Sequence, residues 1–195
     1  MQRVMLSEKP TAVLDACVLY PEHLRDFLLR LASAEAYLPF WTEQIRDEWT
    51  RNLLENRTDI SPERLGRVRR NMNFHFPTAL VQGYEPLIST LSLPHLMDRH
   101  VLAAAIHAKA ECIITFNLDD FPESILQHHK IEALSPDEFV SRLIRKHPNR
   151  VIVGARNHRQ GLTRPAMSPS EYTEMLENQG LAMSVAFLRR HENVI

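Results

Sequence analysis

The chain has 195 residues, of which 44% are hydrophobic and 24% are charged, and its formal net charge is −1. This composition excludes fibrous and disordered classes, and the length predicts one main domain with a substantial core. No apolar run is long enough to span a membrane, and the opening MQRVMLSEKP lacks the apolar core of a signal peptide, so we expect a cytoplasmic protein. Cys17 and Cys112 lie in apolar segments, which favours reduced core residues over a disulfide.

The first part of the chain predicts a β-α-β unit. Residues 12–14 form a short apolar strand that ends at Asp15, and residues 37–40 form a second strand. Between them, the apolar spacing over residues 22–33 predicts an amphipathic helix. Asp15 therefore lies at the carboxyl end of a strand.

A helix from about residue 43 follows, with Thr42 as its predicted N-cap. Glu48 lies within the apolar stripe of this helix, next to Trp49. A glutamate on the buried side of a helix is either paired with an arginine, extended to solvent, or functional. The pattern alone leaves these three interpretations open.

The next helix begins with a serine cap at Ser61 and a proline at its first position, Pro62. One side of it is basic. The arginines on that side are Arg64, Arg67, Arg69 and Arg70. Gly83 and Pro86 interrupt the following stretch, so only a short helix over residues 85–91 is predicted there.

The centre of the chain predicts a helix and a strand with polar groups at their ends. Asp98 begins a segment with apolar residues at helical spacing, and residues 112–115 form a fully apolar strand, as expected of a parallel strand covered on both faces. Asn117, Asp119 and Asp120 follow that strand, at the edge where ligands bind in open α/β sheets. Taken singly, Asp98 is equally well an N-cap and the later acids an ordinary turn.

The C-terminal part begins with a short helix over residues 123–128 and a last strand over residues 131–134. Ser135 and Glu138 then form a predicted capping box. Beyond Pro148 only helical patterns appear, with a capping box at Ser168 and Glu171 and a helix stop at Gly180. We divide the chain into an α/β domain, 10–148, and a helical extension, 149–195. The extension is too small for its own core and should pack on the body or on a partner.

The acidic residues occupy strand ends and helix starts that converge if the strands are parallel. Ionised carboxylates held close together need a compensating cation, and an all-oxygen ligand set selects a hard ion such as Mg²⁺ or Mn²⁺. Such a group supports metal-assisted phosphoryl transfer, in which the ion polarises the phosphate and activates a water.

Four motifs in order resemble those of the PIN-domain ribonucleases: TAVLDACVLYP, QIRDEWTRNL, DRHVLAAAI and TFNLDDFP. In length and in its C-terminal tail the chain is most similar to the longer VapC-type toxins of type II toxin-antitoxin systems. The resemblance implies a three-layer α/β/α PIN-like domain with a central parallel sheet and a helical C-terminal extension. It also implies a Mg²⁺- or Mn²⁺-dependent endoribonuclease that cleaves structured RNA such as tRNA or rRNA, a cognate antitoxin, and a homodimer.

Matched residue by residue, the resemblance makes Asp15 and Asp98 direct metal ligands, with Glu48 and Asp120 acting through water or on a second ion. Asn117 stands where many relatives have Asp, which leaves it as a ligand or a phosphate-positioning amide and leaves the number of ions open.

Other chemistries fit less well. A haloacid-dehalogenase-type phosphatase needs an Asp where Cys17 stands, and a receiver domain needs an acidic pair where Asp15 is alone. The ten histidines contain no HExxH and are interpreted as surface or core residues, and the chain has no glycine-rich phosphate loop. The remaining alternative is a non-catalytic PIN-like module that binds RNA or protein.

An acidic centre repels RNA, so cations at its rim are expected to supply the approach. The dense candidates are an acid-free block after the last strand and the arginines of the helix that begins at Ser61, and the block is the predicted RNA-binding surface. Its members are Arg142, Arg145, Lys146, Arg150, Arg156 and Arg159. The alternative is that these are solvated helix faces or pair with Glu171, Glu174 and Glu177.

Overall fold

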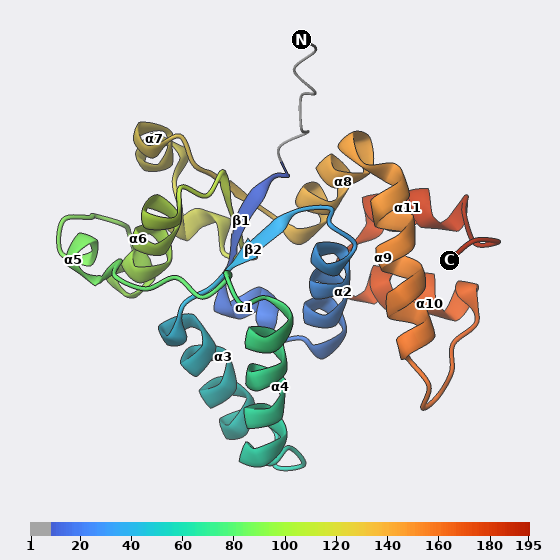
Figure 1. Ribbon diagram of the computed structural model, residues 1–195. Coiled ribbons are helices and arrows are strands. Elements are labelled where there is room, and N and C mark those ends of the chain that lie inside the picture. The colour runs from blue at the N-terminus through green and yellow to red at the C-terminus, as the bar shows by residue number, and fades with distance from the viewer. Residues whose placement is uncertain (1–8) are drawn as a thin grey trace, which may run out of the picture.

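Residues 9–195 are described by the computed structural model of the chain, shown in Figure 1. Most of the opening segment, on which the expectation about a signal peptide rests, lies outside the described residues. Within residues 9–195, no helix combines the length and apolar character that crossing a membrane requires.

Four short parallel strands form one sheet with the order β2-β1-β3-β4. The strands are β1 (Thr11–Leu14), β2 (Leu38–Phe40), β3 (Cys112–Ile114) and β4 (Glu132–Leu134). Leu14 is in register with Ile114, and Ile114 with Leu134. The central strands β1 and β3 are apolar because helices cover both faces of the sheet. Since all four strands run the same way, the residues that follow β1 and β3 lie side by side at the carboxyl edge.

Helices surround the sheet and complete three layers. The bounds are α1 (Ala16–Leu19), α2 (Glu22–Ser33), α3 (Glu43–Asn56), α4 (Pro62–His75), α5 (Glu85–Ile88), η1 (Leu96–Asp98), α6 (Arg99–Ala108), η2 (Leu118–Asp120), α7 (Glu123–Leu126), η3 (Gln127–His129), α8 (Pro136–Lys146), α9 (Pro148–Gly161), α10 (Pro169–Asn178) and α11 (Ala182–Arg189), where η marks a 3-10 helix. Figure 1 shows α6 on one side of the sheet and α2 and α8 on the other, with α3 and α4 projecting as a pair below α1. The predicted fold class, α/β/α with a parallel sheet and a helical C-terminal part, is confirmed.

Local capping signals explain most helix starts. The Thr42 side chain accepts from the Ile45 amide at 3.0 Å, and Ser168 forms the full reciprocal box with Glu171. The box predicted at Ser135 is only half formed. The Ser135 hydroxyl accepts from the Glu138 amide, but the Glu138 carboxylate accepts instead from Arg142 at 2.9 Å, because an arginine one turn later competes for it.

Some predicted boundaries were too long. The helix expected over residues 85–91 ends at Ile88, and the one expected over residues 123–128 splits into α7 and η3. Lys130 stops η3 by adopting the left-handed conformation, with φ of 57°. The two outer strands each begin one residue later than expected, at Leu38 and Glu132.

The C-terminal extension packs on the α/β body, as its small size predicts. Helix α9 crosses α2 at Gly154, where an added Cβ would lie 2.7 Å from Leu31 Cδ2. Helix α11 packs on α8, and the buried Asp137 carboxylate of α8 accepts from the amides of Met183 and Ser184 at 2.8 and 2.9 Å. This carboxylate satisfies the free N–H groups at the start of α11. One continuous core therefore joins the extension to the body.

Candidate active site

The carboxyl edge of the sheet gathers acidic side chains from segments far apart in sequence. Asp15 follows β1, Asp98 precedes α6, and Asp120 ends η2 after β3. Glu48 comes from the middle of α3, which packs on α1. The charges of Asp15, Asp120 and Glu48 all act on Asp98 and raise its pKa. The convergence inferred from the strand ends is therefore present.

Asp15 is the most tightly held of these acids, with only 6% of its surface exposed. One carboxylate oxygen accepts from the Ala16 amide at 2.7 Å, and the other accepts from the Thr115 hydroxyl at 2.7 Å and from the Cys17 thiol at 3.2 Å. Burial raises the pKa of Asp15, and these three hydrogen bonds oppose the rise. Cys17 is thus a half-buried partner of Asp15, which corrects its interpretation as a simple core residue.

Asp98 occupies the N-cap position of α6, yet its side chain makes no capping hydrogen bond. Burial is the largest cause of its raised pKa, followed by the charges of Asp15, Asp120 and Glu48, while His95 acts in the opposite direction. An ordinary N-cap would direct its oxygen at the helix amides. The Asp98 carboxylate is instead directed at the other acids, as a cation ligand would be.

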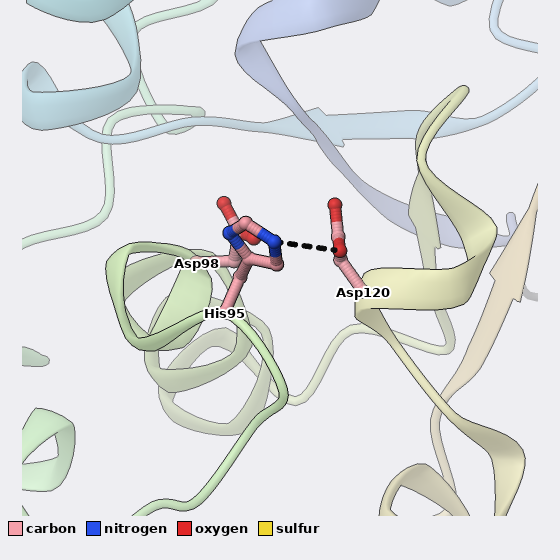
Figure 2. A group of neighbouring side chains, drawn as sticks. All are labelled: His95, Asp98 and Asp120. Carbon is pink, nitrogen blue, oxygen red and sulfur yellow. Dashed lines mark ion pairs between the residues drawn. The ribbon is translucent and has the colours of Figure 1, made fainter.

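His95 joins this cluster, and the sequence interpretation missed it. One ligand atom each from His95, Asp98 and Asp120 lie within 4.8 Å of one another, and His95 Nε2 is 3.9 Å from Asp120 Oδ1. Figure 2 shows the three side chains pointing toward one another from two facing segments, η1 and η2. The sequence signal for His95 was its position three residues before Asp98, because residues i and i+3 of a 3-10 turn lie on the same side.

Glu48 has a histidine partner. Its carboxylate lies 3.5 Å from Nε2 of His100, a buried residue on the first turn of α6. Of the interpretations left open for Glu48, arginine pairing is not what the structure shows. The His100 contact links the helix of Glu48 to the helix that begins after Asp98, so the two acids are held by adjoining elements.

The turn after β3 divides its polar residues. The Asn117 amide donates to the Thr115 hydroxyl at 3.0 Å, and its side chain is exposed beside the cluster. Asp119 is exposed, whereas Asp120 is half-buried and faces His95. Of the two neighbouring aspartates, Asp120 is the one that the fold directs into the site.

This donor set fits a hard divalent cation. Carboxylate oxygens dominate it, and mutual repulsion raises the pKa of Asp98, which a bound cation would relieve. Carboxylates with one imidazole nearby suit Mg²⁺ or Mn²⁺ better than a thiolate-selective ion. Of the residues expected to bind Mg²⁺ or Mn²⁺, Asp98 and Asp120 have ligand atoms within 4.8 Å of each other, and metal binding by the expected set stays a prediction.

Four cations of the predicted RNA-binding surface are bonded within the chain. Arg142 contacts Glu132 and Glu138 at 2.7 and 2.9 Å. The other three donate to backbone carbonyls: Arg150 to Glu35 at 2.6 Å, Arg159 to Met167 at 2.7 Å, and Arg156 to Val194. The suggested pairing with the glutamates of the extension is not what holds them, because Glu171 bonds to Ser168 and Glu177 to Arg189.

The α8 members of this block lie at the opposite edge of the sheet from the acidic cluster. Arg142 and Lys146 line a small depression with Pro10 and Glu111, which precede β1 and β3. That is the amino edge, because the helix after a parallel strand runs back along it. Arg145 is exposed at the same end of α8. RNA binding by these residues stays a prediction, and their placement does not favour it.

A parallel α/β/α domain with an acidic cluster at the carboxyl edge of its sheet is consistent with the PIN-like domain that the sequence motifs imply. Residues 136–190 match a family model described as the VapC50 C-terminal domain. A stretch of 63 residues is 48% identical to the putative ribonuclease VapC50 of Mycobacterium tuberculosis, covering 32% of this chain and 37% of that protein. No solved structure matches the chain.

These matches confirm the resemblance to VapC-type proteins, and the family match falls on the helical extension that the tail motifs indicated. The chain spans little more than a third of the length of the curated relative that it matches. The family match begins at Pro136, so it includes α8, which the division at residue 148 assigns to the nuclease domain. That division stays a prediction.

Proposed function

We propose that this chain is a cytoplasmic Mg²⁺- or Mn²⁺-dependent endoribonuclease of the VapC type. The observation that carries the proposal is the convergence of Asp15, Glu48, Asp98 and Asp120 at the carboxyl edge, where three neighbouring charges raise the pKa of Asp98. Carboxylates are costly to hold together without a cation, so such a cluster indicates a metal-dependent task.

The residues divide the work of binding and orientation. Asp15 and Asp98 hold the cation directly, and Glu48 and Asp120 act through water or at a second position. Thr115 and the α1 amide fix the Asp15 carboxylate, while His100 orients Glu48. Asn117 positions a phosphate oxygen of the substrate from the rim. When bound, Mg²⁺ or Mn²⁺ supplies polarisation of the phosphodiester and a lowered pKa of the attacking water.

The similarity to a protein named as a ribonuclease supports RNA as the substrate class. Structured RNA, such as tRNA or rRNA, is proposed because the motifs resemble those of the longer VapC-type toxins. A non-catalytic module that binds RNA or protein is the alternative. The complete acid set favours the enzyme, because a module released from catalysis would be expected to lose one of these mutually repelling groups.

The test compares Asp15→Asn and Asp98→Asn with a matched control, Asp119→Asn, in an RNA cleavage assay. Each of the first two should lower cleavage by at least ~10²-fold, since each removes a cation ligand. The control removes the same charge from an exposed neighbour and should stay within a few-fold of wild type. EDTA should silence the wild-type chain, and Mg²⁺ or Mn²⁺ should restore it.

Cleavage that survives both Asp15→Asn and Asp98→Asn would contradict the enzyme proposal. RNA or protein binding without metal-restored cleavage would support the module instead.

The partners proposed are a cognate antitoxin and a second copy of the chain. An arginine or lysine from an antitoxin segment would be the natural blocker of an acidic cluster. Light scattering at high protein concentration tests the homodimer, and a monomeric mass there would count against it. An added antitoxin should inhibit cleavage and slow the hydrogen exchange of backbone amides near Asp98.

A further inference from the structure

Exposed apolar side chains, here called the apolar rim, come from the same two chain segments as His95, Asp98 and Asp120. Among the residues that the structure describes, the large hydrophobic side chains that are exposed include Leu96, Met97, Phe116 and Leu118. Leu96, Met97 and Leu118 lie within two residues of a member of the cluster, and Phe116 directly follows Thr115, which donates to Asp15. Single exposed hydrophobics are ordinary on a protein surface, but a group gathered around one polar site indicates a ligand with an apolar part.

The rim has two facing sides. Leu96 and Met97 belong to η1, and Phe116 and Leu118 precede or begin η2. The two segments face each other across the cluster, since ligand atoms of Asp98 and Asp120 lie within 4.8 Å. Both segments that carry the acids therefore also carry exposed apolar side chains.

Phe116 is the aromatic member of the rim, and its backbone is fixed relative to Asp15. The Phe116 amide donates to Cys17 Sγ at 3.2 Å, and the preceding Thr115 donates to Asp15 at 2.7 Å. Thr115 is fully buried, yet 44% of Phe116 remains exposed. Phe116 therefore has an exposed ring on a backbone that hydrogen bonds fix next to Asp15, a proposed cation ligand.

The C-terminal extension borders the same ring. Gly180 lies in the turn between α10 and α11 with φ of +83°, and a Cβ placed on it would lie 3.9 Å from Phe116 Cε1. A glycine at this position lets the turn adopt its left-handed conformation and places no side chain against the ring. The extension therefore forms one wall beside Phe116.

We propose that Phe116 stacks on a nucleobase next to the phosphate held at the acidic cluster. The inference rests on the proposed ribonuclease function. A nucleotide carries both parts that the site offers to bind: a phosphate for a carboxylate-held cation, and a planar base for an exposed aromatic ring. The base must be unpaired to reach the ring, so the substrate presents an unstacked nucleotide at the cleavage site.

The test changes the ring while leaving the acids in place. Phe116→Leu keeps an apolar side chain and removes the π-face, whereas Phe116→Trp keeps stacking. Phe74→Leu is the control, because Phe74 is 80% exposed at the end of α4 and adjoins no acid of the cluster. A single-stranded RNA with 2-aminopurine at successive positions reports both binding and stacking. Binding is measured in the cleavage-deficient Asp98→Asn background.

Phe116→Leu should weaken RNA binding roughly 5- to 150-fold, the range expected for one base-aromatic stack. It should also abolish fluorescence quenching at one probe position. Phe116→Trp should keep both binding and quenching, and Phe74→Leu should match wild type. In the cleavage-competent chain, Phe116→Leu should act mainly on KM. Thermal melting of each variant checks that the fold is retained.

Unchanged binding and quenching in Phe116→Leu, with cleavage still abolished by Asp98→Asn, would overturn the stacking inference and leave the ribonuclease proposal standing. Equal losses in Phe116→Leu and Phe116→Trp would also overturn it, because the π-face would then not be what matters. Failure of the ribonuclease proposal has a different signature, in which Asp98→Asn leaves cleavage unchanged.

Discussion

The two central aspartates differ in what their oxygens contact. Asp15 accepts three hydrogen bonds, while the Asp98 side chain makes no capping bond and is acted on by three like charges. Hydrogen bonds that favour the ionised form offset repulsion at Asp15, but Asp98 has no such compensation at its helix. Removing the charge of Asp98 should therefore change the free energy of unfolding differently from removing the charge of Asp15.

Asp98→Asn should stabilise the metal-free protein at pH 7 by roughly 0.5 kcal/mol, a modest amount because Asp98 is partly exposed and solvent screens its repulsion. The pKa of Asp98 is raised above 3.8, so the native state binds the proton more tightly. The penalty is complete above the folded pKa and disappears as the pH falls through it to the unfolded value. The gain should shrink as pH falls toward 3.8. Asp15→Asn should show less gain or a loss, since it disturbs the bonds from Thr115 and Cys17. Urea unfolding in EDTA at several pH values measures both.

His158 makes the extension sensitive to acid. It is buried between Phe27 and Tyr172, with Nδ1 3.1 Å from the Tyr172 hydroxyl. Burial, followed by the charges of His23 and Arg30, lowers the pKa of His158 from 6.5 to about 3.

Below pH 6.5 the unfolded chain binds a proton at His158, whereas the folded chain keeps His158 neutral. The free energy of unfolding therefore falls as the pH drops below 6.5. From pH 7.5 to pH 5 this group should cost roughly 2 kcal/mol. His158→Asn keeps a polar atom for Tyr172 and does not titrate. Its deficit relative to wild type at pH 7.5 should shrink by that amount at pH 5, as measured by chemical unfolding. A constant difference between the two proteins would show that His158 titrates normally.

At the scale of elements, the α2–α9 crossing joins the extension to the body. Gly154 permits the close approach, because an added Cβ would lie 3.1 Å from Leu31 Cα and 3.2 Å from the Arg30 carbonyl oxygen. Both atoms belong to the α2 backbone and cannot rotate away. The spacing of the two helices is therefore set by the absence of a side chain at this position.

Gly154→Ala should lower stability by about 1–3 kcal/mol, the usual cost of overpacking. Gly66→Ala is the matched control in α4. There the nearest atom is the end of the flexible Arg70 side chain at 3.4 Å, so the better helix propensity of alanine should raise stability by roughly 0.5–1 kcal/mol. Thermal unfolding of both variants measures the opposite signs, and a stabilising Gly154→Ala would mean that the helices are not in close contact.

At the scale of the whole molecule, cations and acids are distributed over different edges. The amino edge carries Arg142 and Lys146, far from the cluster in the strand direction. Helix α4 lies beside the helix of Glu48, since Arg69 pairs with Glu43 and Asp47 on α3. The exposed arginines of α4 are therefore better placed than Arg142 and Lys146 to guide RNA toward the acids.

Arg67→Glu with Arg70→Glu should weaken RNA binding and reduce its salt dependence by roughly one slope unit for each lost phosphate contact. The control pair, Arg145→Glu with Lys146→Glu, lies at the amino edge and should keep the wild-type slope. Replacing Arg150, Arg156 and Arg159 by Glu is a poorer test of RNA binding. These side chains donate to backbone carbonyls, so their loss should destabilise the extension. If only the control pair changed the salt dependence of RNA binding, the basic residues of α8 would be the RNA-binding surface instead.

The sequence by itself determined features whose causes lie within a few residues. The caps at Thr42, Ser61 and Ser168 form as predicted because each bonds to an amide three residues ahead. Apolar runs gave the strands, and strand direction then placed Asp15 and the turn after β3 at one edge. The motif order added Glu48 and Asp98 to that edge.

Only the tertiary structure decided which distant side chains meet. Three contacts join segments with no local pattern in common: His100 with Glu48, the Phe116 amide donating to Cys17, and Gly180 beside Phe116. The arginine block shows the same limit, because a run of like charges in sequence does not say which members the folded chain binds to its own carbonyls. Local hydrogen bonds and periodicity are properties of a segment, whereas these contacts depend on how segments pack against one another.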